Sequence, residues 1–489
     1  MRLSRTWISA LFALWATTDV AVGYEGSTTL AGVTEQAALS SRLHRRMVER
    51  FGLSLGMFEP LRLDPSLLQI DRARNLYVRL SALDAGQGHA PEVLARKEGQ
   101  SLSPLRQHVL GWLAAGSVLE TTPAVRVRHH FVDGKTGAGL HRLSDMTAIS
   151  ASAESVQQGI SSVRQLLSGA AMDGTGRSAT EWITASDNDL GLPAFWDAYE
   201  RAVTAQTTVA RETALTEALL SLGGLLAVLE QAGDPAYVHN DLQSVLSGHY
   251  AHFVGQRYGR AGVPQPDAKL DVPSPQRFAD LLFDGKGQGL SERTASRFVS
   301  PGTISPSLIP QGSKLFGVGG YLSSSTVKHF LAWQKSDTEP GGRVLFLDER
   351  CYTDYATALL PEIGKFAQVG LDFLLRGDLR LSLASESGLT VKLLDEQLGS
   401  GTLTVLGEKA SGERQVFKTQ ATLPSRPGVL TQVPLSEEAL TDFVRLAVLW
   451  KGRDRNGQPV VTSSVLSLRK SESVPSPAAS QTETSEPSQ

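Results

Sequence analysis

Four side chains that can bind metal ions lie close together in the middle of the sequence. His239, Asp241, His249 and His252 fall within fourteen residues and offer imidazole and carboxylate groups, which are common zinc ligands. His249 and His252 are three positions apart, so a helix would present both imidazoles on one face. A histidine near a helix end is more often hydrogen-bonded or exposed than bound to metal. The spacing therefore predicts a candidate zinc site, with an ordinary structural role as the alternative.

Two adjacent histidines form a second candidate. His129 and His130 are neighbours in the sequence, and neighbouring side chains on an extended or helical segment point in different directions. They therefore cannot both face one small site. His130 is the candidate of the pair for a leftover metal ligand, and we expect His129 to lie at the surface.

Amphipathic helices must position these histidines. Between residues 34 and 51, apolar residues recur mostly at four-residue spacing among charged ones, which indicates an amphipathic helix. Such helices bury their apolar faces against one another, so the sequence predicts a helical bundle with long connections. Similar helical spacing occurs in five further segments, which are 104–118, 151–167, 193–209, 212–231 and 352–375.

Two stretches break the helical pattern. Residues 262–319 contain seven prolines among many Gly and Ser residues, so we expect a long, irregular excursion at the surface. After Gly377, short runs with period two and β-branched residues predict strands, which we expect to form a small antiparallel β-sandwich. The fold class is therefore mainly α, a helical bundle followed by that sandwich. The predicted strands are 379–383, 389–393, 403–406, 415–422 and 444–450.

The two ends of the chain are predicted to lie outside the folded domains. Arg2 and Arg5 precede a short apolar run and the small residues Ala21 and Gly23, which indicates a secretory signal peptide. The last nineteen residues are rich in Ser, Pro, Glu and Gln, and we expect them to be disordered. The predicted organisation is a signal peptide (1–23), a helical domain (24–377, with the excursion at 262–319), a sandwich (378–470) and a disordered tail (471–489).

Composition excludes some classes of function. The chain of 489 residues has 47 basic and 50 acidic side chains and a formal net charge of -3, so no nucleic-acid partner is expected. No stretch after the signal peptide is long and apolar enough to span a membrane.

Cys351 is the only cysteine, so we expect no internal disulfide, and its apolar neighbours predict that it is buried. We expect an exported protein, in the periplasm or outside a bacterial cell.

Four blocks of the sequence resemble the zinc-dependent phospholipase C / P1 nuclease family. Residues 235–241 (Pro-Ala-Tyr-Val-His-Asn-Asp) resemble the family's Pro-Ala-His-x-x-Asn-Asp segment. Glu120, followed by residues 129–133 (His-His-Phe-Val-Asp), is similar to the family's acidic residue and its later His-Phe-Tyr-Asp-Pro segment. The other two blocks are the first helix of the mature chain (30–37) and the last helix (359–377). The resemblance implies a phospholipase C-like helical bundle that carries a C-terminal β-sandwich.

The resemblance also implies zinc ligands, but most of their positions hold other residues here. Phosphodiester cleavage in this family uses clustered zinc ions, which supply hydroxide and neutralise charge on the phosphate. Only His130, Glu120 and the N-terminal aromatic residue Tyr24 remain as remnants, and three zinc ions cannot be held by that set. The family's other ligand positions carry Leu30, Thr121, Ala227, Gln231, Tyr237, Ser247 and Ala251 in this chain.

Two explanations fit these vacancies. In the first, the fold is kept and apolar volume fills the old cleft; the protein is then noncatalytic, needs no cofactor, and binds a protein partner or a lipid-like surface ligand. In the second, the ligands have moved, and a divergent zinc-dependent phosphodiesterase of the phospholipase C or nuclease type uses His130, His239, Asp241, His249 and His252. A structural component of the cell envelope, with the sandwich as its working part, is a third hypothesis. The sequence favours the first.

Overall fold

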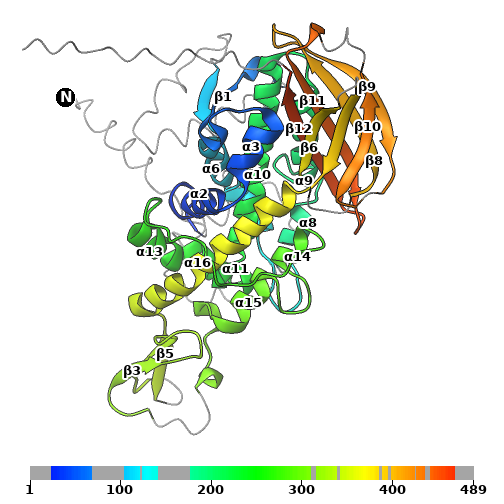
Figure 1. Cartoon of the computed structure of the whole chain (residues 1–489). Helices are drawn as coiled ribbons and strands as arrows, with labels where there is room; N and C mark the ends of the chain where they lie inside the picture. The colour runs from blue at the N-terminus through cyan, green and yellow to red at the C-terminus, as the bar shows by residue number, and fades with distance from the viewer. Residues whose placement is uncertain are drawn as a thin grey trace, which may run out of the picture.

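The computed structural model consists of a mostly helical body followed by a strand-rich unit (Figure 1). The predicted signal peptide, the predicted helix at 151–167 and the predicted tail at 471–489 lie outside the residues that the structure describes. The described residues are 24–68, 104–121, 124–140, 177–309, 315–338, 342–384, 388–394, 398–424, 426–435 and 441–468.

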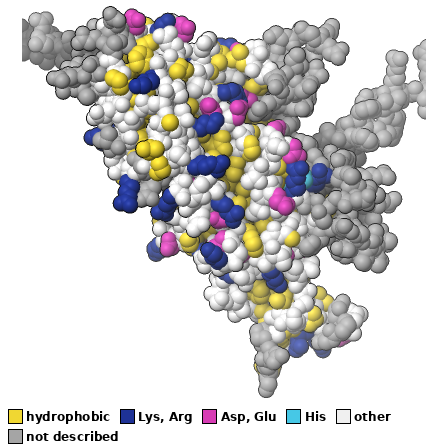
Figure 2. All heavy atoms as spheres, turned by 90° about the vertical axis from the view of Figure 1, so that its right-hand side faces the viewer, with side chains coloured by type: hydrophobic (Ala, Val, Ile, Leu, Met, Phe, Trp, Pro, Cys, Tyr) yellow, Lys and Arg dark blue, Asp and Glu magenta, His cyan; other side chains and the backbone are white. Residues whose placement is uncertain are grey.

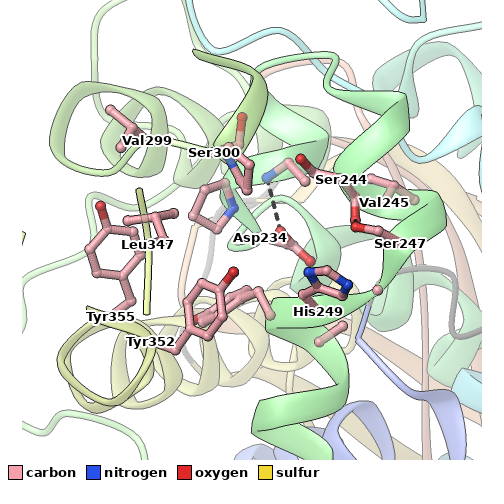
Figure 3. A pocket seen from close by; sticks show the side chains of 16 residues that line it. Asp234, Ser244, Val245, Ser247, His249, Val299, Ser300, Leu347, Tyr352 and Tyr355 are labelled. Atoms are coloured by element: carbon pink, nitrogen blue, oxygen red, sulfur yellow. Dashed lines mark hydrogen bonds between the residues drawn. The ribbon is translucent and has the colours of Figure 1, made fainter. Parts of the chain in front are cut away.

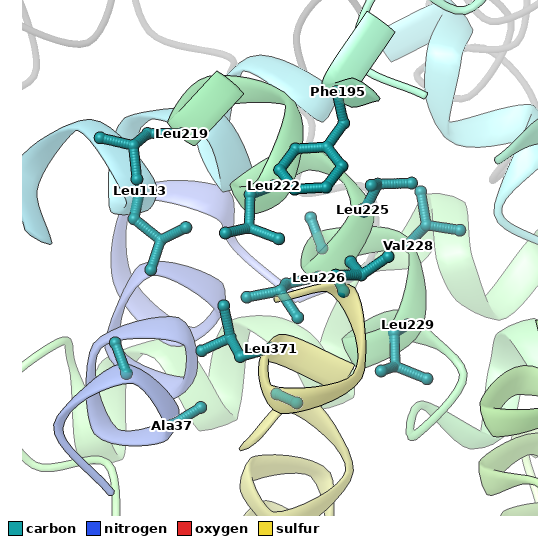
Figure 4. Close-up of a cluster of buried hydrophobic side chains, with 14 of the residues drawn as sticks. Ala37, Leu113, Phe195, Leu219, Leu222, Leu225, Leu226, Val228, Leu229 and Leu371 are labelled. Atoms are coloured by element: carbon teal, nitrogen blue, oxygen red, sulfur yellow. The ribbon is translucent and has the colours of Figure 1, made fainter. Parts of the chain in front are cut away.

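Helix α10 (Thr208–Gln231) is the centre of the helical body. Contrary to the expectation from the sequence, α10 is long and apolar enough to cross a membrane by length and composition. However, 94% of its most apolar window is buried inside the protein, as in the core helix of a globular fold. Its leucines pack against side chains of the surrounding helices (Figure 4). The helices packed around α10 are α2 (Ala31–Ser40), α6 (Val109–Glu120), α9 (Leu192–Thr204) and α16 (Glu349–Leu374).

Two glycines allow α6 and α10 to approach each other closely. A Cβ atom added at Gly223 would lie 2.0 Å from the carbonyl oxygen of Leu113, and one added at Gly116 would lie 2.2 Å from the carbonyl oxygen of Leu220. Real Cβ atoms do not approach backbone oxygens so closely. The contact between these two helices therefore requires glycine at both positions, and it fixes the distance between the end of α6 and the end of α10.

The first two predicted helices differ in detail from the structure. The helix expected over 34–51 is two helices, because Ser41 has an extended backbone (φ -94°, ψ -178°) that ends α2, and α3 (Leu43–Phe51) begins after Arg42. The helix expected over 104–118 begins with a strand, β2 (Leu105–His108), because β1 (Pro60–Leu63) pairs with it before α6 starts. The helices expected over 193–209, 212–231 and 352–375 are confirmed as α9, α10 and α16.

The proline-rich excursion is only partly irregular. Its helices α14 (Ala279–Leu282) and α15 (Leu290–Arg297) carry Leu282 and Leu290, which are completely buried in the main core. The expectation that residues 262–319 run over the surface is therefore wrong for these two helices. The prolines lie before and after them, so short helices can form in the proline-free part of the segment. The remaining short helices are α8 (Ala179–Trp182), α11 (Pro235–Val238), α12 (Leu242–Ser247) and α13 (His249–Tyr258).

A small antiparallel sheet inside the helical part of the sequence was not predicted. Strands β3 (Gly319–Leu322), β4 (Leu331–Lys335) and β5 (Arg343–Phe346) pair in that order. The sheet and the preceding segment, from Val299 to Ile309, pack around a small core that contains Leu331 and Trp333. The sheet projects from the helical body at the end opposite the C-terminal unit (Figure 1).

The C-terminal unit is an antiparallel β-sandwich, as predicted. One sheet has the strand order β10-β7-β6 and the other β12-β11-β8-β9, and both contribute to a core that contains Val391 and Trp450. The five predicted strands are confirmed, while β10 and β12 were missed. The strands are β6 (Leu379–Ala384), β7 (Gly388–Leu393), β8 (Leu398–Glu408), β9 (Arg414–Thr422), β10 (Gly428–Pro434), β11 (Arg445–Asp454) and β12 (Pro459–Ser467).

Buried charges join the sandwich to the helical body. Arg50 Nη2 donates to Asp378 Oδ1 at 2.5 Å, and Arg46 Nε donates to the same oxygen at 3.2 Å. Burial alone would raise the pKa of Asp378, but Arg50 and Arg46 lower it to about 2. Asp378, which lies just before β6, is therefore a charged residue held by three arginines of α3, the third being Arg45, whose Nη2 donates to Oδ2 at 2.8 Å.

Candidate functional site

Two of the predicted remnants, Glu120 and His130, lie side by side in the core. Glu120 ends α6, and its Oε1 is 3.2 Å from His130 Nε2. The other ring nitrogen of His130, Nδ1, is 2.5 Å from Oε1 of Gln231 at the end of α10. All three side chains are completely buried. The structure therefore brings together His130 and Glu120, and both nitrogens of the imidazole already have a protein partner.

Further donors complete the surroundings of Glu120. Trp182 Nε1 donates to Oε1 at 2.7 Å, and Arg126 Nη2 donates to Oε2 at 2.6 Å. Arg126 also donates to Asn188 Oδ1 at 2.8 Å. Burial would raise the pKa of Glu120, but Arg126 and then His130 lower it to about 2. Glu120 is therefore an ionised carboxylate whose charge is balanced by an arginine.

His129 does not lie at the surface, contrary to expectation. Its side chain is 9% exposed and stacks on the indole of Trp182, with 4.4 Å between the ring centroids. Burial and the nearby Arg128 lower the pKa of His129 to about 4, so the imidazole is neutral near pH 7. The apolar face of Trp182 explains the difference, because stacking covers an uncharged ring that would otherwise face solvent.

His239 and Asp241 each have structural partners. His239 Nε2 lies 2.8 Å from the carbonyl oxygen of Phe298. Asp241 is the N-cap of α12 and accepts from the Ser244 N–H at 3.1 Å, while its other oxygen accepts from the Gly302 N–H at 2.7 Å. These contacts join the start of α12 to the segment that follows α15.

His249 and His252 lie on α13, and both are exposed. His252 Nε2 is 2.8 Å from the side-chain nitrogen of Gln256, one turn further along the helix. Within the ranges that the structure covers, no three His, Cys, Asp or Glu side chains are arranged so that they could hold a metal ion. The five predicted ligands thus stand in separate environments, and zinc binding through them remains a prediction.

An open pocket lies between α11, α12 and α13 on one side and α16 on the other (Figure 3). Its volume is about 410 Å³ with the open mouth included. Ser247 and Ala251, the residues at two ligand positions implied by the family resemblance, line it. Hydroxyl groups make up most of its polar lining, which includes Ser244, Ser247, Ser300, Tyr352 and Tyr355.

Asp234 lies in the wall of this pocket and was missed in the sequence. It is 3% exposed, accepts a hydrogen bond from the Ala236 N–H at 2.9 Å, and caps α11. Burial raises its pKa to about 7. In Figure 3 the carboxyl group lies in the middle of the lining, between Ser300 and His249. Its position directly before Pro235 is the usual sequence signal of a helix N-cap.

Glu230 is a second buried carboxyl group near the end of α10. Thr34 Oγ1 donates to its Oε1 at 2.8 Å, while its Oε2 has no hydrogen-bond partner. Burial raises the pKa of Glu230 to about 8, so the group is mostly protonated at pH 7. Glu230 lies four residues before Asp234. Two acidic residues so close together at the end of an apolar helix are the sequence signal that could have identified this pair of buried carboxyl groups.

The other vacant ligand positions are filled with buried side chains. Leu30, Ala227 and Tyr237 are all completely buried. The ring of Tyr237 packs against that of Phe131 at an angle of 39°, with 4.7 Å between the ring centroids. Tyr24 is 1% exposed and its hydroxyl lies 3.3 Å from the carbonyl oxygen of Gly233, to which it donates. The side chains of these residues are packed in the protein interior.

The chain matches no protein family model, and no curated protein is similar to it in sequence. The solved structures to which it is similar, at low sequence identity, include two clostridial alpha toxins. The alpha toxin from Clostridium absonum has a TM-score of 0.30 and 11% identity, with 91% of this chain and 93% of that chain covered. The alpha-toxin of Clostridium perfringens from the avian strain SWCP has a TM-score of 0.27 and 9% identity, with 90% of this chain and 98% of that chain covered.

Proposed function

We propose that this chain is an exported, noncatalytic protein that binds a partner or a component of the cell envelope. The observation that carries the proposal is that the polar side-chain atoms of Glu120 and His130 all have hydrogen-bond partners within the protein. Both are fully buried, and both oxygens of Glu120 and both ring nitrogens of His130 have protein partners. A general acid or base must come within hydrogen-bond reach of a substrate, and these two groups are enclosed by protein.

The charge around Glu120 supports the same proposal. A zinc site combines anionic or neutral ligands around a cation. Here the guanidinium of Arg126 provides the positive charge that compensates Glu120, at 2.6 Å from Oε2. Adding a zinc ion beside a buried arginine would bring two cations into a water-poor region, which is costly. The cluster is suited to holding α6, α10 and α8 together.

Ligand binding is assigned in this proposal to the pocket beside α13. Its hydroxyl groups can donate and accept hydrogen bonds, and Asp234 adds a carboxyl group that changes its charge near pH 7. The pocket thus offers recognition of a small polar group without a metal or a nucleophile activated by a base. Export to the periplasm or the exterior is part of the proposal and rests on the predicted signal peptide.

Metal analysis and hydrolysis assays test the noncatalytic character. We expect the purified chain, dialysed against zinc and then washed, to hold far less than one zinc per chain. It should show no chelator-sensitive cleavage of bis(4-nitrophenyl) phosphate or of phospholipid vesicles. Stoichiometric zinc together with cleavage that His249→Ala or His130→Ala abolishes would overturn the proposal in favour of the divergent phosphodiesterase.

A blocking substitution tests the pocket. Ser247 is exposed at its rim, so Ser247→Trp should close the pocket without disturbing the core. Ser296→Trp, on the exposed side of α15 outside the pocket, is the matched control. We expect retention of solubilised envelope components on the immobilised protein to be lost in the first variant and kept in the second. Equal retention by both would show that the pocket is not the binding site.

A further inference from the structure

The β3–β5 sheet is a firmly attached projection. Tyr355 Oη of α16 donates to the carbonyl oxygen of Phe330 at 2.8 Å. Asp354 Oδ2, on the same helix, accepts from the His329 N–H at 2.8 Å. Leu331 and Trp333 are buried in a small core that the segment before the sheet helps to cover, through Val299, Ile304, Leu308 and Ile309.

The loop that leads into β3 exposes large apolar side chains at the end of this projection. Phe316 and Val318 are each 79% exposed. Between them, Gly317 has a φ of +91° and open space around it, which favours glycine and turns the chain sharply. Single exposed apolar side chains are normal on a protein surface, whereas a contiguous apolar patch marks an interaction site.

Hydrogen bonds hold this loop against two basic residues. The Lys335 N–H donates to the carbonyl oxygen of Val318 at 2.9 Å, and Arg343 Nη2 donates to the carbonyl oxygen of Leu315 at 3.2 Å. Lys335 and Arg343 are opposite each other in the β4–β5 pair, and both are exposed. The apolar loop and the two cations therefore occupy the same end of the sheet.

The outer face of β5 continues the apolar surface. Val344 is 38% exposed and Phe346 is 36% exposed, whereas Leu345 between them packs on the small core. This alternation is that of a strand with one covered and one open face. Figure 2 shows hydrophobic and basic side chains together at this lower end of the molecule.

The charge of the projection differs in sign from that of the whole chain. Residues 315–346 contain Lys328, Lys335 and Arg343 as bases and Asp337 and Glu339 as acids, a formal net charge of +1. The complete chain has -3. An anionic surface would therefore be attracted to this end of the molecule.

We propose that the end of the β3–β5 projection docks onto an anionic lipid surface, with Phe316 and Val318 inserted among the lipids and Lys335 and Arg343 at the head groups. A bilayer accepts a convex apolar tip, whereas a protein partner would need a matching cavity. Interfacial binding combines buried apolar area with attraction between basic residues and anionic lipids. This inference goes beyond the proposed function, because it names one envelope component and a surface other than the pocket lining.

Sedimentation with vesicles tests the docking surface. The mature chain is mixed with vesicles of phosphatidylcholine alone or with about one third phosphatidylglycerol, the anionic content being high enough to attract a basic tip. We expect preferential binding to the anionic vesicles that weakens with added salt. Phe316→Ser combined with Val318→Ser should reduce the partition coefficient by about tenfold or more, and Lys335→Gln combined with Arg343→Gln should remove the preference for anionic vesicles.

The control variant removes two exposed apolar side chains from the sandwich. Val416 is 60% exposed and Leu423 is 83% exposed, so Val416→Ser with Leu423→Ser matches the loop variant in chemistry and exposure. We expect it to bind vesicles as the wild type does. Absence of wild-type binding, or loss in the sandwich variant with retention in the loop variant, would overturn the inference. Neither result bears on zinc content or hydrolysis, so the proposed noncatalytic function would stand or fall separately.

Discussion

Arg126 Nη2 lies 2.6 Å from Glu120 Oε2, and the carboxylate that receives this bond is completely buried. The arginine comes from a short 3-10 segment, Ala124–His129, that follows α6. Its guanidinium also lies over the ring of Trp182, 5.2 Å from the centroid. Arg126 thus places a fixed positive charge beside Glu120, the one acidic residue kept from the site implied by the family resemblance. Glu120 therefore has a structural role as a charge-compensated carboxylate.

Removing the arginine should strongly destabilise the fold. In Arg126→Gln, Glu120 would be left as a buried charge without compensation, and we expect the free energy of unfolding to fall by about 3–5 kcal/mol. Urea unfolding followed by circular dichroism measures this change. The double variant Glu120→Gln/Arg126→Gln should recover part of the loss, because the buried charge is then absent. Arg277→Gln, which breaks an exposed pair with Asp280, should cost about 1 kcal/mol or less.

Stability should decline as the pH rises from weakly acidic to weakly alkaline values. Burial raises the pKa of Glu230 from an ordinary 4.5 to about 8. Between these two values the folded chain keeps a proton that the unfolded chain has released, so the stabilisation present below pH 4.5 is lost as the pH rises through 8. Over this range the free energy of unfolding should fall by up to about 1.4 kcal/mol per pH unit from this group.

Glu230→Gln isolates that contribution. The amide keeps the acceptor for Thr34 but cannot ionise, so the variant should be more stable than the wild type at pH 8.5 and should show a flatter pH profile. Denaturant midpoints between pH 5 and pH 9 give the comparison. A wild-type profile that the substitution leaves unchanged would contradict the assignment. Asp234→Asn should flatten the profile near pH 7 in the same way, because the pKa of Asp234 is raised to about 7.

Neutralising Asp378 should weaken the joint between the helical body and the sandwich. Asp378→Asn would leave the buried guanidinium groups of Arg46 and Arg50 without their shared carboxylate, at an expected cost of about 3–5 kcal/mol. Limited proteolysis should then release the C-terminal unit earlier than in the wild type. Asp267→Asn, at an exposed position, provides the control and should leave the digestion pattern unchanged.

A methyl group at Gly223 should force α6 and α10 apart. The added Cβ would lie 2.0 Å from the carbonyl oxygen of Leu113, and backbone cannot move aside as a side chain can. We expect Gly223→Ala to lower the free energy of unfolding by about 1–3 kcal/mol, measured by thermal and urea denaturation. In Gly255→Ala the nearest atom is the end of the Glu25 side chain at 3.1 Å. Better helix propensity should make that control neutral or stabilising by up to about 1 kcal/mol.

The order of helices and strands was largely predictable because it depends on local periodicity. The apolar pattern of 212–231 and the alternation of 389–393 each identify their element from a few neighbouring residues. The sheet β3–β5 escaped prediction since its strands are only four or five residues long. The break at Ser41 escaped because the apolar spacing of Leu39, Leu43 and Met47 continues across it, although the backbone of Ser41 is extended.

The sequence by itself determined a mostly helical chain with a C-terminal β-sandwich and few candidate ligands, because residue type and periodicity report on elements one at a time. Only the tertiary structure decided what those candidates touch. It buried Glu120, His130 and Gln231 in one cluster with Arg126, gave Asp241 the role of a helix cap, and placed Asp234 in a pocket wall. The physical reason is that charge compensation and burial depend on residues far apart in the chain, whose approach is fixed by packing such as the contact of α6 with α10.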